Sequence, residues 1–217
     1  MKTRKYDTRW TVGVALMAAI VVLLANTPLG MIQLPIIKAT TVHIPVILGA
    51  ILLGPMAGAI LGAVFGICSI VSATVAPTLM SFAFSPFMST TGMPGVFKSL
   101  WIALGCRILV GVISGWLWIG LKKLKLNDMI ALPIVGFLGS MSNTVLVMGS
   151  IYFLLAEQYA AAREVAMSAV YGLIMATITG VGVMEAIAAL VLVTAIGKAL
   201  LHAMSRLPDS KQVARLQ

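Results

Sequence analysis

Five long runs with almost no charged residue constrain this chain more than any other feature: Val12–Ala25, Ile44–Phe97, Ile108–Leu121, Met129–Ala156 and Val165–Gly197. About 20 apolar residues in a helix cross a bilayer, so these runs hold enough material for about six crossings. Of the 217 residues, 60% are hydrophobic and only 10% are charged, whereas water-soluble domains carry about 25% charged residues. Backbone in lipid must satisfy its own hydrogen bonds. The sequence therefore predicts an all-α integral membrane bundle of six transmembrane helices.

We expect the helices at about residues 10–26, 44–54, 56–74, 96–121, 129–157 and 165–204, all in a single domain that covers residues 1–217. The second helix is too short to cross alone unless the loop before it, with three prolines, dips into the protein. The long loop at about residues 72–95 mixes Ser and Thr with aromatic residues. It is interpreted either as a lid or as a segment lying in the lipid interface.

The formal net charge of +9 has an uneven distribution that fits membrane topology. If the chain starts inside and crosses six times, most basic residues fall on the cytoplasmic side, as the positive-inside rule requires. This predicts cytoplasmic termini, with a basic N-terminal segment at 1–9 and a C-terminal tail at about 205–217, and needs no nucleic-acid partner. The outer loops would hold only Lys38, Lys98 and Arg163. The cytoplasmic set is Lys2, Arg4, Lys5, Arg9, Lys122, Lys123, Lys125, Lys198, Arg206, Lys211 and Arg215.

A glycine-rich stretch, "HIPVILGAILLGPMAGAILGAVFG", predicts a helical hairpin. Gly54-Pro55 should form the turn, because glycine frees the backbone and proline is tolerated at the start of a helix. Gly58, Gly62 and Gly66 lie about one turn apart and form a stripe of small residues. In a membrane such stripes allow close contact between helix backbones. We expect this stretch to be scaffold.

Motifs of enzymes are missing from the sequence. It contains no G-x-x-x-x-G-K-[ST], no H-E-x-x-H and no G-x-S-x-G. The two histidines lie near opposite ends of the predicted bundle, and the two cysteines lie inside predicted spans, so we expect no disulfide and no metal site. The sequence predicts a protein that is not an enzyme and binds no cofactor, and an intramembrane enzyme is the less favoured alternative.

Polar groups within the apolar helices are the candidates for a binding site. Arg107, Asn143 and Glu185 fall on three consecutive predicted helices, and ionisable residues at membrane depth usually serve a pathway or a site. Arg107 suits a carboxylate or phosphate, and Asn143 with Thr144 suits an amide or hydroxyl. The alternative is that Arg107 and Glu185 only pair with each other, with Asn143 bonded between helices. His43, at a loop end, is either a ligand or a local cap.

The first predicted helix carries "VGVALMAAI", in which Ala15 and Ala19 lie four residues apart and therefore on one face. Two small residues on one face serve either for packing inside the bundle or for docking of a partner's helix.

The ordered segments resemble a known family, the substrate-binding S components of energy-coupling factor (ECF) vitamin transporters. The glycine-rich stretch and the four segments that follow it are similar to the pantothenate-type members, and the resemblance spans residues of about 10–204. Those four segments are "APTLMSFAFSPF", "CRILVGVISGW", "GSMSNTVLVMGSIY" and "GVMEAIAALVLV".

The resemblance implies a multi-pass subunit of a bacterial cell membrane that captures a vitamin, with pantothenate expected and another vitamin as the alternative. It implies binding of a membrane coupling subunit (EcfT) through Ala15 and Ala19. It also implies two ATPase subunits (EcfA and EcfA′), which use ATP and Mg. Arg107, Asn143, Thr144 and Glu185 would then hold the ligand, with His43 and Phe84 in the loops that close over it; Glu185 contacts either the ligand or Arg107.

Overall fold

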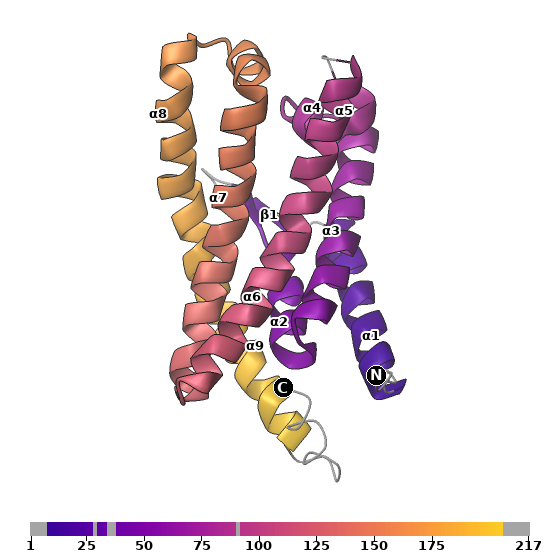
Figure 1. The fold of residues 1–217 in the computed structure, drawn as a ribbon, viewed down its shortest axis with the longest axis vertical. Helices are drawn as coiled ribbons and strands as arrows, with labels where there is room; N and C mark the ends of the chain where they lie inside the picture. Colours follow the sequence, from indigo (N-terminus) through magenta and orange to yellow (C-terminus); the bar gives the residue numbers. More distant parts are fainter. Residues whose placement is uncertain (1–7, 28–29, 34–37, 90–91, 206–217) are drawn as a thin grey trace, which may run out of the picture.

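The computed structural model describes residues 8–27, 30–33, 38–89 and 92–205, and within them the chain is a helical bundle with one small hairpin (Figure 1). Within these ranges, five segments are long and apolar enough to cross a membrane: Thr8–Ala25, Pro55–Val75, Gly92–Lys123, Asp128–Arg163 and Met167–Ala203. The helical membrane architecture is confirmed. The number of six crossings stays a prediction, because the remaining apolar helix, His43–Leu53, has only 11 residues.

The first part of the chain contains helix α1 (Thr8–Ala25), a hairpin and helix α2 (His43–Leu53). In the hairpin, strands β1 (Met31–Gln33) and β2 (Lys38–Thr40) pair antiparallel, and β2 contacts helix α9 (Val183–Ser205). In Figure 1 the hairpin lies at mid-height in the bundle, above α2. The segment before α2 thus enters the protein, as its apolar composition predicts, but it contains strands where we expected an irregular loop.

Helix α3 (Pro55–Val75) follows α2 through the predicted turn. Gly54 has a φ of 92°, a value that residues with a Cβ rarely adopt, and Pro55 is the first residue of α3. The glycine stripe then lies against the next long helix. A Cβ on Gly66 would lie 2.6 Å from the carbonyl oxygen of Ala103, and Cβ atoms on Gly58 and Gly62 would meet the carbonyl oxygens of Gly111 and Arg107. The prediction of backbone-to-backbone contact is confirmed.

The segment after α3 is not the structureless loop that we expected. It contains helix α4 (Ser81–Phe84) and a short 3₁₀ helix, η2 (Pro86–Met88). The Ser81 hydroxyl accepts a hydrogen bond from the Thr78 amide over 2.8 Å, which links the first residue of α4 to the turn before it. A local hydrogen bond of serine therefore helps to order a segment whose composition alone predicts a loop.

A long helix then begins at Gly92, earlier than the predicted residue 96. It consists of α5 (Gly92–Leu100), the π-helical turn η3 (Trp101–Gly105) and α6 (Cys106–Lys123). Lys98 therefore lies inside α5 and not in an outer loop. The Ser99 hydroxyl donates to the Phe82 carbonyl oxygen over 2.8 Å, which links α5 to α4.

Two further long helices complete the bundle. Helix α7 (Asp128–Arg163) has a non-helical residue, Leu155, with φ −136° and ψ 25°. At this irregularity the Leu154 carbonyl oxygen accepts a hydrogen bond from Lys98 Nζ over 2.9 Å. The last long helix consists of α8 (Met167–Thr177), the π-helical turn η4 (Ile178–Gly182) and α9. Arg163, predicted in a loop, lies in the last turn of α7.

The bundle has two distinct ends in Figure 1. The start of α1, the turn between α2 and α3, and the end of α9 lie at one end. The opposite end carries α4, α5 and the connection from α7 to α8. The predicted basic segment and C-terminal tail lie largely outside the described residues, at 1–7 and 206–217.

Candidate functional site

Arg107 and Asn143, predicted on neighbouring helices, meet inside the bundle. Arg107 on α6 is only 8% exposed and Asn143 on α7 only 6%, and Arg107 Nη1 donates a hydrogen bond to Asn143 Oδ1. The backbone of Arg107 is fixed by the close approach of Gly62 on α3. The guanidinium also lies against two aromatic rings, 4.5 Å from the centroid of Phe65 and 5.7 Å from that of Phe84. Aromatic faces stabilise a cation that has little access to water.

Glu185 lies on α9, three residues after the π-helical turn η4, and is 8% exposed. It is close enough to Arg107 for an electrostatic interaction between the two charges. The turn η4, just before α9, packs on α7, since a Cβ on Gly182 would lie 2.8 Å from Thr144 Cγ2. The third residue of the predicted set therefore belongs to the same buried cluster. The role of Glu185, as a partner of Arg107 or of a ligand, stays a prediction.

His43 lies inside the protein at the first residue of α2 and is 1% exposed. Neither ring nitrogen has a hydrogen-bond partner in the described part of the chain, and Arg107 is near enough to act on it electrostatically. A local cap would bond to the adjacent backbone, and α2 has no side-chain hydrogen bond at its N-cap. The geometry thus favours membership of the buried cluster over a capping role.

Thr144 and Phe84 border the same cluster from α7 and α4. The Thr144 side chain is 7% exposed, and its Oγ1 has no hydrogen-bond partner among the described residues. Phe84 is partly buried in the short helix that follows α3, with its ring toward the guanidinium. All six residues predicted from the sequence lie in this one region, and their role in binding remains a prediction.

Two residues of the cluster were not predicted from the sequence. Ser140 is fully buried, lies one helical turn before Thr144, and has an Oγ without a partner in the part that the structure describes. The sequence feature that could have identified Ser140 is its spacing of four residues from Thr144, which places both side chains on one face of the helix. Phe65 gave no signal, because it lies within a wholly apolar run. Ser142, the residue before Asn143, donates instead to the Gly139 carbonyl oxygen over 2.7 Å.

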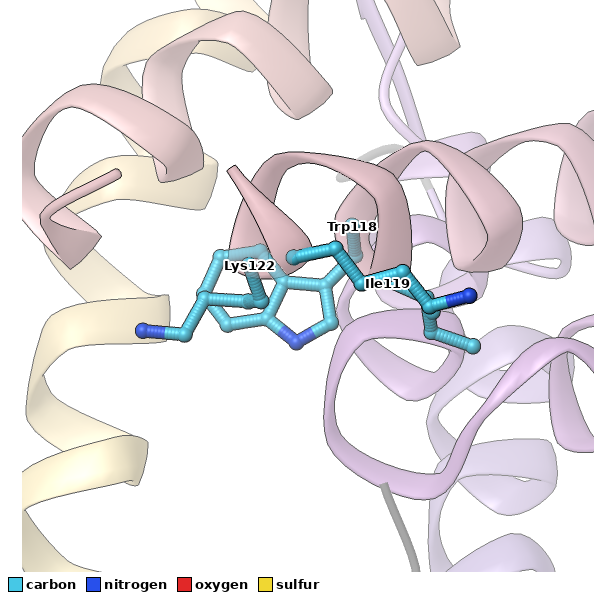
Figure 2. Close-up of a pocket in the computed structure, with 4 residues that line it drawn as sticks. Trp118, Ile119 and Lys122 are labelled. Atoms are coloured by element: carbon cyan, nitrogen blue, oxygen red, sulfur yellow. The ribbon is translucent and has the colours of Figure 1, made fainter. Parts of the chain in front are cut away.

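A separate groove of about 290 Å³ lies near the other end of α6 and is lined by Trp118, Ile119, Lys122 and Lys123. Figure 2 shows the Trp118 indole between the side chains of Lys122 and Ile119. The Lys122 ammonium lies 5.6 Å from the Trp118 ring centroid and forms an ion pair of 2.7 Å with Asp128. Trp118 lies eleven residues beyond Arg107, which is about 16 Å along a helix. This groove is therefore distinct from the buried polar cluster.

Metal coordination has no support in the described ranges. No group of three or more histidine, cysteine or carboxylate side chains lies there in a position to hold a metal ion. The chemistry that the cluster offers is hydrogen bonding and charge pairing by an arginine, an amide, hydroxyls and an imidazole, enclosed by aromatic rings. Such a set suits an anionic solute with polar groups.

The pair of small residues on α1 faces away from the bundle. Ala15 and Ala19 are both exposed, whereas Val14 and Val21 on the opposite side are buried. Trp10 Nε1 donates to the Leu53 carbonyl oxygen over 2.9 Å and attaches the start of α1 to the end of α2. Ala15 and Ala19 thus do not pack inside this bundle, and their role in docking stays a prediction.

Comparison with known proteins agrees with this architecture. Residues 11–197 match the family described as "ECF transporter, substrate-specific component". The chain is also 38% identical over 168 residues to the "Pantothenic acid transporter PanT" of Lactococcus lactis subsp. cremoris, an alignment that covers 77% of this chain and 80% of that protein. The helical bundle is consistent with these matches. The chain belongs to the family of substrate-specific (S) components of ECF transporters.

Proposed function

We propose that this S component captures pantothenate from outside a bacterial cell and delivers it inward through an ATP-driven coupling module. The similarity to a pantothenic acid transporter supports the choice of ligand. The observation that carries the proposal is a buried arginine, Arg107, that is held by Asn143 on one side and has an unpartnered Nε within the described residues. A buried cation with an unused donor is suited to an anionic ligand.

The chemistry of pantothenate matches the cluster. It is an anion with an amide and two hydroxyls, so it needs one cationic contact and several neutral hydrogen-bond partners. Arg107 would hold the carboxylate through the guanidinium edge that carries Nε, while Asn143 would bind the amide or a hydroxyl. Glu185 would accept from a hydroxyl or balance the charge of Arg107. Phe65 and Phe84 would exclude water from the charged end.

The proposed orientation has both termini in the cytoplasm. The start of α1 and the end of α9 lie at the same end of the bundle as the basic end of α6, with Lys122 and Lys123 (Figure 1). This arrangement agrees with the positive-inside rule. The opposite end would then face outward, and α4, which carries Phe84, would form part of the lid over the ligand.

Transport requires partners that this chain does not supply. We propose that the exposed face of α1 at Ala15 and Ala19 binds the coupling subunit (EcfT), because small residues let two helix backbones approach closely. ATP and Mg would be bound by two ATPase subunits (EcfA and EcfA′), which would power the release of the vitamin.

The proposal is tested by titration calorimetry of the purified subunit with pantothenate, alongside a thermal-shift panel of other vitamins. A ligand at 100 times its Kd raises stability by about 2.7 kcal/mol. We expect Arg107→Ala to weaken pantothenate binding by well over tenfold, since charged hydrogen bonds contribute about 1.5–3 kcal/mol. The matched control is Arg163→Ala, which removes an exposed arginine. Stabilisation by another vitamin but not by pantothenate would refute the assignment of pantothenate as the ligand. Unchanged affinity in Arg107→Ala would refute the assignment of Arg107 to the binding site.

A further inference from the structure

Three buried polar side chains of the cluster lack hydrogen-bond partners in the described residues: His43 at both ring nitrogens, Ser140 at Oγ and Thr144 at Oγ1. Their exposed fractions are 1%, 0% and 7%. Buried polar groups are almost always hydrogen-bonded, and a buried group left without a partner is costly. These three groups therefore require an explanation.

Other hydroxyls in the helices bond to the carbonyl oxygen of their own preceding turn. Ser114 donates to Val110 over 2.8 Å, Thr177 to Leu173 over 2.9 Å, and Thr194 to Leu190 over 2.6 Å. A serine or threonine hydroxyl in a helix can use this local acceptor when its rotamer points toward the preceding turn. Ser140 and Thr144 have the same opportunity on α7, and their hydroxyls do not take it. Their side chains are thus oriented for a different partner.

The three side chains come from two helices, α2 and α7, that pack on each other. The face of α7 with Ser140 and Thr144 also contacts α9 and η4, because a Cβ on Gly136 would lie 2.9 Å from the Ala189 carbonyl oxygen and a Cβ on Gly182 would lie 2.8 Å from Thr144 Cγ2. Ser140 and Thr144 are four residues apart and share one face of α7. Helix α2 packs on that part of α7, because a Cβ on Gly139 would lie 3.0 Å from Ile47 Cδ1. The two helices run in opposite directions (Figure 1). His43, one turn before Ile47, therefore lies at the level of the α7 residues that follow Gly139.

The guanidinium of Arg107 lies at one side of this group. Asn143, which accepts from Arg107, falls between Ser140 and Thr144 in sequence. The cluster thus divides into a cationic part, with Arg107 between its aromatic rings, and a neutral part with two hydroxyls and an imidazole. A neutral imidazole offers one donor and one acceptor, and each hydroxyl can donate and accept. Groups that do both are matched by ligand hydroxyls.

We propose that His43, Ser140 and Thr144 form a hydroxyl-binding subsite that sets the specificity of the protein. The subsite receives the hydroxyl-bearing end of a ligand whose acid end binds Arg107. The inference rests on the proposed function, and it deepens that function by assigning the orientation of the ligand. The ligand class is an acid with hydroxyl groups remote from its carboxylate, as distinct from an unsubstituted acyl acid.

The test measures the Kd of three ligands by calorimetry: pantothenate, its alcohol pantothenol, and a dideoxy analogue in which hydrogen replaces both hydroxyls. A site built to bond a hydroxyl strongly rejects an analogue that lacks it, so we expect the wild-type protein to bind the dideoxy analogue at least about tenfold more weakly than pantothenate. Ser140→Ala should weaken pantothenate by about tenfold and leave the dideoxy analogue within about twofold. Thr144→Val and His43→Gln should show the same pattern.

Two controls separate the subsite from general damage. Ser114→Ala removes a buried hydroxyl that is satisfied by its own helix, so all three ligands should keep their affinities. Arg107→Gln should show the opposite selectivity, with loss of pantothenate binding and little change for pantothenol. This pair of patterns would establish which end of the ligand each part of the cluster holds.

The outcomes distinguish the inference from the proposed function. If wild-type protein does not bind pantothenate, the proposed function and the inference both fail. If it binds pantothenate and the dideoxy analogue equally, the proposed function stands and the hydroxyl subsite is refuted. Equal weakening of both ligands by Ser140→Ala and by Thr144→Val would also refute it, because the hydroxyls would then serve only the structure.

Discussion

Substitution of Gly62 by alanine would test whether the contact between α3 and α6 positions the binding site. The added Cβ would lie 2.8 Å from the carbonyl carbon of Arg107 and 2.9 Å from Ile108 Cα, and closer still to the Arg107 carbonyl oxygen. These are backbone atoms, so no side-chain rotation can relieve the clash. The two helices must move apart, and the movement is centred on the residue that we assign to the ligand carboxylate.

The magnitude follows from the contact distances. Ordinary van der Waals contact begins at 3.4 Å, so the contact with the carbonyl carbon alone requires α6 to move by about 0.6 Å at Arg107, and the closer carbonyl oxygen requires more. Overpacking of this kind costs about 1–3 kcal/mol, while replacing glycine by alanine in a helix gains about 1 kcal/mol. We expect a net loss of stability of up to about 2 kcal/mol. The shift also disturbs the bond from Arg107 to Asn143, and a loss of about 1.4 kcal/mol there lowers affinity about tenfold.

The assay combines thermal unfolding in detergent with calorimetric titration of pantothenate. The matched control is Gly120→Ala on α6 itself, where an added Cβ would meet nothing within 4 Å. That variant should be as stable as the wild type or slightly more stable, with unchanged affinity. If Gly62→Ala behaved like Gly120→Ala in both measurements, the argument that close helix contact positions Arg107 would be wrong.

Three further substitutions test other contacts. Trp10→Phe removes the hydrogen bond to the Leu53 carbonyl oxygen, so the free energy of unfolding should fall by about 1 kcal/mol; an unchanged unfolding transition would show that this bond does not hold α1. Lys98→Met removes the donor to the Leu154 carbonyl oxygen, and amide hydrogen exchange after that residue in α7 should accelerate, whereas equal protection would assign the local order to packing alone. Ala19→Leu adds bulk to the exposed face of α1; pantothenate affinity should stay within about twofold and assembly with the coupling subunit should weaken by at least about tenfold, and normal assembly would exclude this face as the docking site.

Much of the fold is a local property of the chain and was predictable. The lengths of the apolar runs predict the membrane helices, because in lipid the backbone has no hydrogen-bond partners outside the protein. The Gly54-Pro55 turn follows from the conformational freedom of one residue and the helix-starting tendency of the other. The contact of Gly62 with α6 follows from small residues one turn apart, although the sequence did not identify the partner helix.

The predicted site residues share one physical signal. Arg107, Asn143 and Glu185 stand out because polar groups are rare at membrane depth, and the fold brings all three to one region. Ser140 was missed because serine is common in helices and usually bonds to its own backbone, as Ser142 does here. Two serines two residues apart therefore have the same local sequence signal and different environments.

The sequence by itself determined that this chain is a membrane-embedded helical bundle with a glycine-lined hairpin and a few buried polar groups, because apolarity, turn chemistry and residue spacing are properties of short segments. The tertiary structure alone decided which face each polar group presents. The π-helical turns η3 and η4 precede Arg107 and Glu185 by only a few residues, and a π-turn rotates every later side chain relative to the preceding α-helix. The periodicity of the apolar residues does not predict that rotation, because the rotation arises from the packing of one helix on another.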